Sequence, residues 1–292
     1  MRAIFLLLLL SPSLLAEPIR IVTSVEPLKT FAEKIGGDLV EVTSLVRPGY
    51  NPHTYDLSAQ QIMGLSNADL FIRTGVPFES AWMERLHSAN PSMMMVDARE
   101  GLALLMLQSH EHEHHHNHHQ NEKNNGSLVA GETDPHIWTD PVRAGQMAQN
   151  IMQAMVQFSP SNENTFKANL AEFIREIEQL DSDIHASLSM SDNRKFLVFH
   201  PAWGYFADRY GLEQVAIEYQ GKEPGAKAVA RIISMAQKEG IRVIFVQPQF
   251  DQRLARQIAD SIEGQVLVVD PLSSDYINNM RAVARQFGKA MH

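Results

Sequence analysis

Three histidines stand in separate motifs built from prolines and aromatic residues. They are His53 in NPHTY, His136 in DPHIW and His200 in FHPAW. A fourth stretch, residues 110 to 119, holds seven histidines in ten positions. Isolated imidazoles beside prolines and aromatic rings indicate a preorganised binding site, whereas clustered imidazoles indicate a flexible site that binds more weakly. Because imidazole is a frequent ligand of transition metals, a chain with both patterns is predicted to handle such a metal.

The segments that must position these histidines alternate between strand-like and helix-like patterns. Short apolar runs typical of buried strands occupy 19–25, 39–46, 69–73, 93–96, 195–199, 214–217, 242–246 and 265–269. Amphipathic stretches typical of helices occupy 27–35, 58–65, 78–87, 203–210, 225–238, 252–262 and 276–287. Near-continuous apolar strands that alternate with helices predict parallel sheets covered by helices.

A long stripe of apolar residues lies between the strand-like and helix-like segments before residue 100 and those after residue 190. Its members recur at spacings of three and four residues: Phe166, Leu170, Phe173, Ile174, Ile177, Leu180, Ile184 and Leu188. Ser159 is a plausible cap, and Pro160 suits the first helical position. We therefore predict a helix over 159–190. The expected fold is α/β, with two Rossmann-like lobes, 17–158 and 191–292, each with its own core and joined by this one long, rigid helix.

The candidate ligands follow predicted strands. His200 and Asp270 come directly after apolar runs, and His53 lies a few residues past another. Ligands bind outside the carboxyl ends of parallel strands, so these groups are expected to meet in the cleft between the lobes. Three neutral imidazoles and one carboxylate suit tetrahedral Zn²⁺, whereas Mn²⁺ prefers more oxygen and Cu(I) prefers sulfur.

Each candidate also has an ordinary structural interpretation. A single histidine beside a proline is commonly a loop residue bonded to backbone, and only the three matching settings favour a site. Asp270 precedes a proline, and its alternative role is to cap the following turn. Glu218, just past a predicted strand, is the other possible carboxylate.

The histidine-rich segment interrupts the alternation. Residues 108–133 lack an apolar period, which predicts a solvated loop that is disordered without ligand. Its imidazoles are candidate accessory ligands for weak, exchangeable metal capture: His110, His112, His114, His115, His116, His118 and His119. The alternative is a tolerated insert that happens to bind metal.

The N-terminal segment, the cysteine count and the net charge restrict the compartment and the partners of the protein. Residues 1–16 read as a cleaved secretory signal peptide, with a basic start, an apolar run and a small-residue exit. The chain has no cysteine, so neither disulfides nor a lipid-modified cysteine are expected, and the mature chain should be free in a periplasm. Its net charge of −9 argues against nucleic acid as a partner.

Four motifs together resemble one family. They are RPGYNPHTYD at 47–56, DPHIWTDP at 134–141, FHPAWGYF at 199–206 and VDPL at 269–272. They are similar, in the same order, to motifs of the metal-binding solute-binding proteins of ABC importers, the ZnuA-like group of the TroA superfamily (cluster A-I). The similarity covers essentially the whole mature chain, including the long helix.

The resemblance implies a monomeric periplasmic receptor that captures Zn²⁺ and delivers it to a membrane permease with its cytoplasmic ATPase. It carries over His53, His136 and His200 as ligands and puts Asp270 at the family's carboxylate position. Manganese- and iron-type relatives commonly have glutamate at the third position, so His200 favours zinc. Zinc members often have an acidic residue near the first ligand, where this chain has Asn51 and Pro52. The fourth ligand is therefore open between Asp270 and water.

Other classes of protein remain as alternatives. Within the family the rival is a manganese- or iron-type receptor, and outside it a free-standing periplasmic metal chaperone. A secreted zinc hydrolase needs a general base beside an open metal position. The chain has no His-Glu-x-x-His motif, and we predict that it is not an enzyme.

Overall fold

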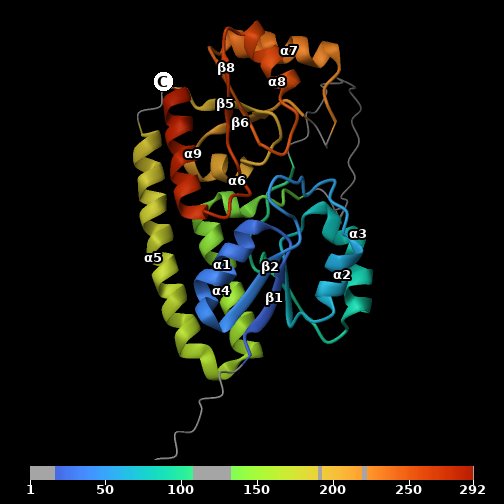
Figure 1. Ribbon diagram of the computed structural model, residues 1–292. Coiled ribbons are helices and arrows are strands. Elements are labelled where there is room, and N and C mark those ends of the chain that lie inside the picture. The colour runs from blue at the N-terminus through green and yellow to red at the C-terminus, as the bar shows by residue number, and fades with distance from the viewer. Residues whose placement is uncertain (1–16, 108–132, 190–192, 219–221, 292) are drawn as a thin grey trace, which may run out of the picture.

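The computed structural model describes residues 17–107, 133–189, 193–218 and 222–291. Two α/β lobes are stacked end to end, and each is built around a four-stranded parallel sheet (Figure 1). This confirms the predicted fold class. The predicted signal peptide and the candidate accessory histidines from His110 to His119 lie outside the described residues, so both stay predictions.

The first lobe has its strands in the order β2-β1-β3-β4. Its strands are β1 Ile19–Thr23, β2 Val40–Ser44, β3 Leu70–Arg73 and β4 Met94–Asp97. Its helices are α1 Glu26–Gly36, α2 Ala59–Leu65, α3 Pro77–Ala89 and α4 Pro141–Phe158. Helices α2 and α3 cover one face of the sheet and α1 and α4 the other (Figure 1). The central strands β1 and β3 are therefore largely buried, as their apolar sequences require.

The second lobe repeats this arrangement with the strand order β6-β5-β7-β8. Its strands are β5 Lys195–Val198, β6 Glu213–Ala216, β7 Val243–Val246 and β8 Gln265–Val268. Its helices are α6 Gly204–Tyr210, α7 Ala226–Lys238, α8 Arg253–Ser261 and α9 Tyr276–Ala290. In each sheet the second strand in the chain lies on one side of the first strand, and the later strands lie on its other side. At such a switch in strand order, the loops at the carboxyl ends of the strands leave room for a ligand.

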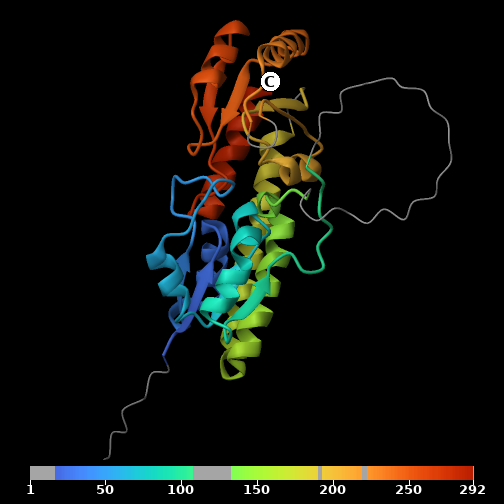
Figure 2. The same ribbon diagram turned by 90° about the vertical axis from the view of Figure 1, so that its right-hand side faces the viewer.

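The long helix is present, with a different start from the predicted one. A 3₁₀ turn, Pro160–Asn162, precedes α5, which runs from Glu163 to Leu188. The Ser159 side chain makes no capping bond to the helix; its hydroxyl accepts a hydrogen bond from Asn162 at 2.9 Å. Of the eight apolar residues in the predicted stripe, seven are buried and Ile174 is partly buried. Helix α5 packs on α1 and α4 in the first lobe and on α9 in the second (Figures 1 and 2).

Helix α4 is an element that we did not predict. Its buried face consists mostly of small residues, methionines and one isoleucine, including Ala144, Gly145, Met147 and Ile151. The signal at its start was nevertheless present, because the Asp140 carboxylate accepts from the backbone N–H of Val142 at 2.8 Å and Pro141 follows the cap.

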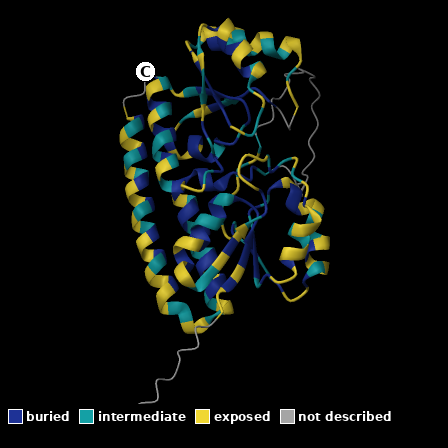
Figure 3. Ribbon diagram, in the orientation of Figure 1, coloured by how far each residue is buried: buried dark blue, intermediate teal, exposed yellow. Residues whose placement is uncertain are grey.

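The main hydrophobic core crosses the boundary between the lobes. One continuous buried cluster includes Phe31 of α1, Trp138, Phe173 of α5, Trp203 and Phe287 of α9. A smaller second cluster lies between the second sheet and helices α7 and α8. Figure 3 shows buried residues in both lobes and at the junction between them. The expectation of a separate core for each lobe is therefore wrong, because α5 and α9 join the two. Among the described helices, none has the length and apolar character that crossing a membrane requires.

Candidate metal centre

The three predicted histidines meet at the junction of the lobes. His53 lies in the loop between β2 and α2, His136 lies just before the 3₁₀ turn Ile137–Thr139, and His200 follows β5. Their ligand atoms all lie within 4.8 Å of one another, and they form the one such cluster of metal-binding side chains in the described part of the chain. The ring centroids are 4.5 to 5.4 Å apart. Residues from both lobes thus face a single point.

His53 is positioned by a tight local turn. The Asn51 side chain accepts a hydrogen bond from the backbone N–H of His53 at 2.8 Å, and the Asn51 carbonyl accepts one from Thr54 at 3.3 Å. Such turns are the usual role of asparagine before proline. The imidazole is only partly buried, so it closes the outer side of the cluster.

His136 is buried and its ring is held by a carboxylate. Asp134 Oδ1 lies 2.7 Å from Nδ1 of His136 and also accepts the backbone N–H of His136 at 2.9 Å. A carboxylate at Nδ1 favours the proton on that nitrogen, so the lone pair is left on Nε2. His136 Nε2 faces His53 Nε2 at 3.4 Å.

His200 is also buried, and its surroundings fix the ring in the same way. Glu218 Oε1 lies 3.3 Å from Nδ1, the ring stacks on Phe250 at 4.8 Å, and the His200 carbonyl accepts from the Gln247 amide at 2.8 Å. The remaining ring nitrogen, Nε2, is buried and has no hydrogen-bond partner. Because an unpaired buried polar atom is costly, this nitrogen fits a ligand better than a structural role.

The electrostatics of the cluster favour neutral rings. Burial, helped by the neighbouring His200 and His136, lowers the pKa of His53 from 6.5 to about 2. Burial also lowers the pKa of His200, although the Glu218 carboxylate opposes this shift. Both imidazoles are therefore uncharged near neutral pH, which is the form that binds a metal ion.

The two candidate carboxylates are placed differently from the histidines. Asp270 lies outside the cluster, and its Oδ1 accepts the backbone N–H of Leu272 and the side-chain amide of Gln249, both at 2.9 Å. It thus caps the turn, as the alternative interpretation expected, and its assignment as a fourth ligand stays a prediction. Glu218 orients His200 from behind and does not face the cluster.

A small cavity of about 10 Å³ lies against the three imidazoles and is also lined by Gln249, Phe250 and Leu272. This is about the space of one water-sized sphere. The arrangement is suited to one ion held by three nitrogen atoms, with one position left for a water or another oxygen.

Asp134 is the residue whose role the sequence did not reveal. The DPHIW motif predicts His136 as a ligand, but the sequence assigns no role to the carboxylate of Asp134 two residues before it. The spacing was a usable signal, since Asn51 and Asp134 both precede their histidine by two residues with a proline between. The difference is that Asp134 holds the imidazole as well as the backbone.

Two parallel α/β lobes on one long helix, with three imidazoles at their junction, define a solute-binding protein of the metal-receptor class. The chain belongs to the family described as ZnuA, zinc-uptake complex component A periplasmic, whose model matches residues 21–290.

The chain is also similar to zinc-binding proteins and to a solved ZnuA structure. The chain is 28% identical over 270 residues to the zinc-binding protein AdcA of Streptococcus pyogenes, which covers 90% of this chain and 52% of AdcA. It is 28% identical to the zinc-binding lipoprotein AdcA of Streptococcus pneumoniae, over 88% of this chain and 50% of that protein. The chain thus spans about half the length of these relatives. A crystal structure of ZnuA superimposes with a TM-score of 0.85 at 34% identity, covering 94% of this chain and all of the other.

Proposed function

We propose that this protein is a periplasmic receptor that binds one Zn²⁺ ion between its lobes and delivers it to an ABC permease with its cytoplasmic ATPase. Nε2 of His53, His136 and His200 are the proposed ligands. The observation that carries the proposal is the convergence of three imidazoles from both lobes, with Nε2 of His200 buried and unpaired among them. The names of the zinc-binding relatives support the same ligand.

The choice of zinc over manganese follows from the donor atoms. Three neutral nitrogen atoms and one remaining position match tetrahedral Zn²⁺, whereas manganese prefers several oxygen ligands. The nearby carboxylates have other partners: Asp134 contacts His136, Glu218 contacts His200, and Oδ1 of Asp270 accepts from Leu272 and Gln249. Water is the proposed fourth ligand, because Asp270 lies outside the cluster of the three histidines.

Capture and release are proposed to involve small movements. The main hydrophobic core passes through both lobes and α5 spans them, which opposes wide hinge closure. His53 is the least buried of the three ligands and lies in a loop, so we propose that zinc orders this loop onto the other two histidines.

The most direct experiment is metal content and zinc titration of the whole protein, with a competing chelator that keeps free zinc too low for weak sites. The parent protein should bind one tight equivalent, and the triple change of His53, His136 and His200 to alanine should abolish it. The exposed His185 changed to alanine is the matched control and should leave it intact. Tight stoichiometric binding by the triple variant would falsify the site.

A manganese receptor, a free-standing chaperone and a hydrolase are separated by further measurements. Competition between Zn²⁺ and Mn²⁺ ranks the metals. Loss of zinc-dependent growth on deletion of the gene, together with zinc transfer to a reconstituted permease, separates a receptor from a chaperone. A hydrolase would turn over esters or peptides.

Three finer points belong to the proposal. Since the 292 residues contain no cysteine that could carry a lipid, we propose that the mature protein is free, unlike the lipoprotein relative. We propose separately that it is a monomer. Fractionation, intact mass and sedimentation test both points. We also propose that the seven histidines from 110 to 119 are accessory ligands. Deleting 110–119 should remove weak zinc equivalents and leave the tight one.

A further inference from the structure

The residue that orients His136 is itself held from the other lobe. Asp134 precedes His136 in the chain and belongs to the first lobe, but its backbone carbonyl accepts a hydrogen bond from the Tyr205 hydroxyl at 3.0 Å. Tyr205 is fully buried at the start of α6 in the second lobe. The same hydroxyl accepts the backbone N–H of Leu105 at 2.9 Å. One phenol therefore joins two segments of the first lobe, of which one leads directly to a proposed ligand.

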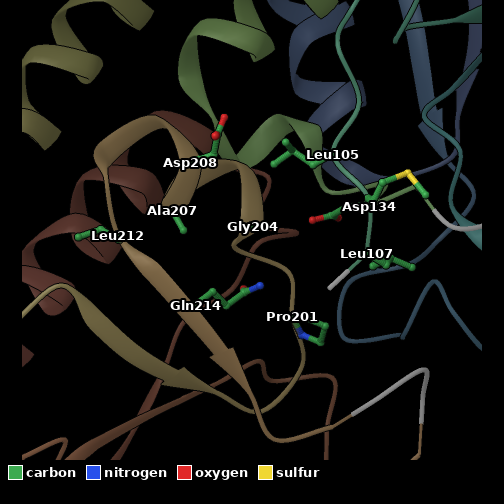
Figure 4. A pocket seen from close by; sticks show the side chains of 10 residues that line it. Leu105, Leu107, Asp134, Pro201, Gly204, Ala207, Asp208, Leu212 and Gln214 are labelled. Carbon is green, nitrogen blue, oxygen red and sulfur yellow. The ribbon is translucent and has the colours of Figure 1, made fainter. Parts of the chain in front are cut away.

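The neighbouring residue, Gly204, makes a second contact with Asp134. A Cβ atom at Gly204 would lie 2.7 Å from Asp134 Oδ2, which is closer than real Cβ contacts allow. The backbone of Gly204 lies outside the left-handed region, so the helix itself does not demand glycine there. Figure 4 shows the Asp134 side chain pointing towards Gly204 from across the cavity that they both line. The missing side chain is what allows the carboxylate its position.

Helix α6 is firmly attached to the first lobe, as a support must be. Arg143 of α4 forms an ion pair with Asp208 of α6 at 2.8 Å, and its guanidinium lies over the Tyr205 ring at 5.1 Å. The second lobe thus contacts the first beside Asp134 through the Tyr205 hydroxyl, the backbone of Gly204 and the ion pair of Asp208.

We propose that Gly204 and Tyr205 are positioning residues for zinc binding. They fix Asp134 so that its Oδ1 holds Nδ1 of His136 and turns Nε2 towards the other two histidines. This inference rests on the proposed function and deepens it. It makes the orientation of a first-lobe ligand depend on how the second lobe is seated, because neither contact exists when the lobes are apart.

Two substitutions test the proposal, each with a control of the same chemical change. Tyr205→Phe removes only the hydroxyl, and Tyr210→Phe removes a hydroxyl on the same helix that donates to Asp181, away from the site. Gly204→Ala adds a methyl group against Asp134, and Gly64→Ala adds one in a helix where nothing lies within 4 Å. Removing an outer partner of a ligand histidine typically costs ~10–100-fold in metal affinity.

We expect Tyr205→Phe and Gly204→Ala each to raise the Kd for zinc about tenfold in chelator competition with the full chain. The two controls should stay within about twofold. Thermal unfolding of all four metal-free variants shows whether each is folded. If either test variant does not fold, the other still decides the question.

The decisive step is to repeat both changes in an Asp134→Ala background. If Gly204 and Tyr205 act through Asp134, neither change should weaken zinc binding further there. The ¹⁵N resonances of His136 should also show partial loss of the Nδ1–H tautomer in Tyr205→Phe alone. Equal losses with and without Asp134, or parent-like affinity in both single variants, overturn the inference. Failure of the parent protein to bind zinc would instead overturn the proposed function.

Discussion

At the scale of single residues, the site depends on the groups behind the histidines as much as on the histidines. Asp134 and Glu218 lie against Nδ1 of His136 and His200, so both Nε2 lone pairs are directed inward. The sequence identified the three imidazoles because proline and aromatic neighbours marked them. It did not identify Asp134 as their support, because a one-dimensional pattern does not show which way a carboxylate faces.

Asp134→Ala should therefore weaken zinc binding by ~10–100-fold while the protein stays folded. The reason is that His136 loses both the bond that fixes its tautomer and the one that fixes its backbone. Chelator competition measures the change. Asp56→Ala, an exposed carboxylate close to His53 in the chain, is the control and should bind as the parent does. Equal affinity of the two variants would contradict the assigned role.

Acid should destabilise the metal-free protein through the same histidines. The pKa of His53 is lowered to about 2 in the folded state, whereas in the unfolded chain it lies near 6.5. The unfolded chain thus binds a proton that the folded state refuses. The contribution of such a histidine to the free energy of unfolding is fully present above pH ~6.5. It is lost as the pH falls below that value, by up to about 1.4 kcal/mol per pH unit for each such group.

Urea unfolding between pH 7 and pH 5 measures this loss, and His53→Gln should make the dependence shallower. The same substitution at the exposed His87 serves as the control. A dependence on pH that is as steep in His53→Gln as in the parent protein would argue against a neutral His53 in the folded state.

At the scale of elements, periodicity located most of the helices and strands, and its failures have physical causes. The stripe on α5 was visible because its residues are large and apolar. Helix α4 packs against α5 through small residues, and a Cβ at Gly145 would lie only 3.1 Å from the Ile174 side chain. Close packing favours small side chains, whereas the predicted stripe on α5 consists of phenylalanine, leucine and isoleucine.

The apolar face of α5 should carry a large part of the stability. Phe173 is 1% exposed and its ring lies 5.4 Å from Phe31 of α1. Phe173→Ala should lower the free energy of unfolding by about 3–5 kcal/mol. Phe158→Ala makes the same change at a side chain that is 43% exposed and should cost far less. Denaturant titrations that gave equal losses would show that this face is not the core.

At the scale of the whole molecule, the lobes are coupled more tightly than the repeated sheet order suggests. Besides the shared core, Trp138 Nε1 donates to the Pro271 carbonyl at 2.6 Å, and the Tyr276 hydroxyl donates to the Trp138 carbonyl at 2.7 Å. The sequence predicted two lobes because it contains two series of alternating elements. The continuity of their cores depends on which helix faces touch in space, which the chain order does not specify.

We therefore expect a single cooperative heat-absorption peak for the metal-free protein, since neither lobe buries its inner surface without the other. Differential scanning calorimetry checks this, with the ratio of van't Hoff to calorimetric enthalpy near one. Zinc should move the whole peak to higher temperature. Two resolved peaks, of which zinc moves only one, would show that the lobes unfold independently.

The distribution of the three histidines along the chain has a consequence for when the protein acquires its cargo. They lie at positions 53, 136 and 200, so the last ligand and the helix that supports Asp134 arrive only with the second lobe. A chain that has been synthesised only through the first lobe would hold an incomplete set. With the proposed ligands, zinc is expected to bind tightly only after the second lobe has folded onto the first.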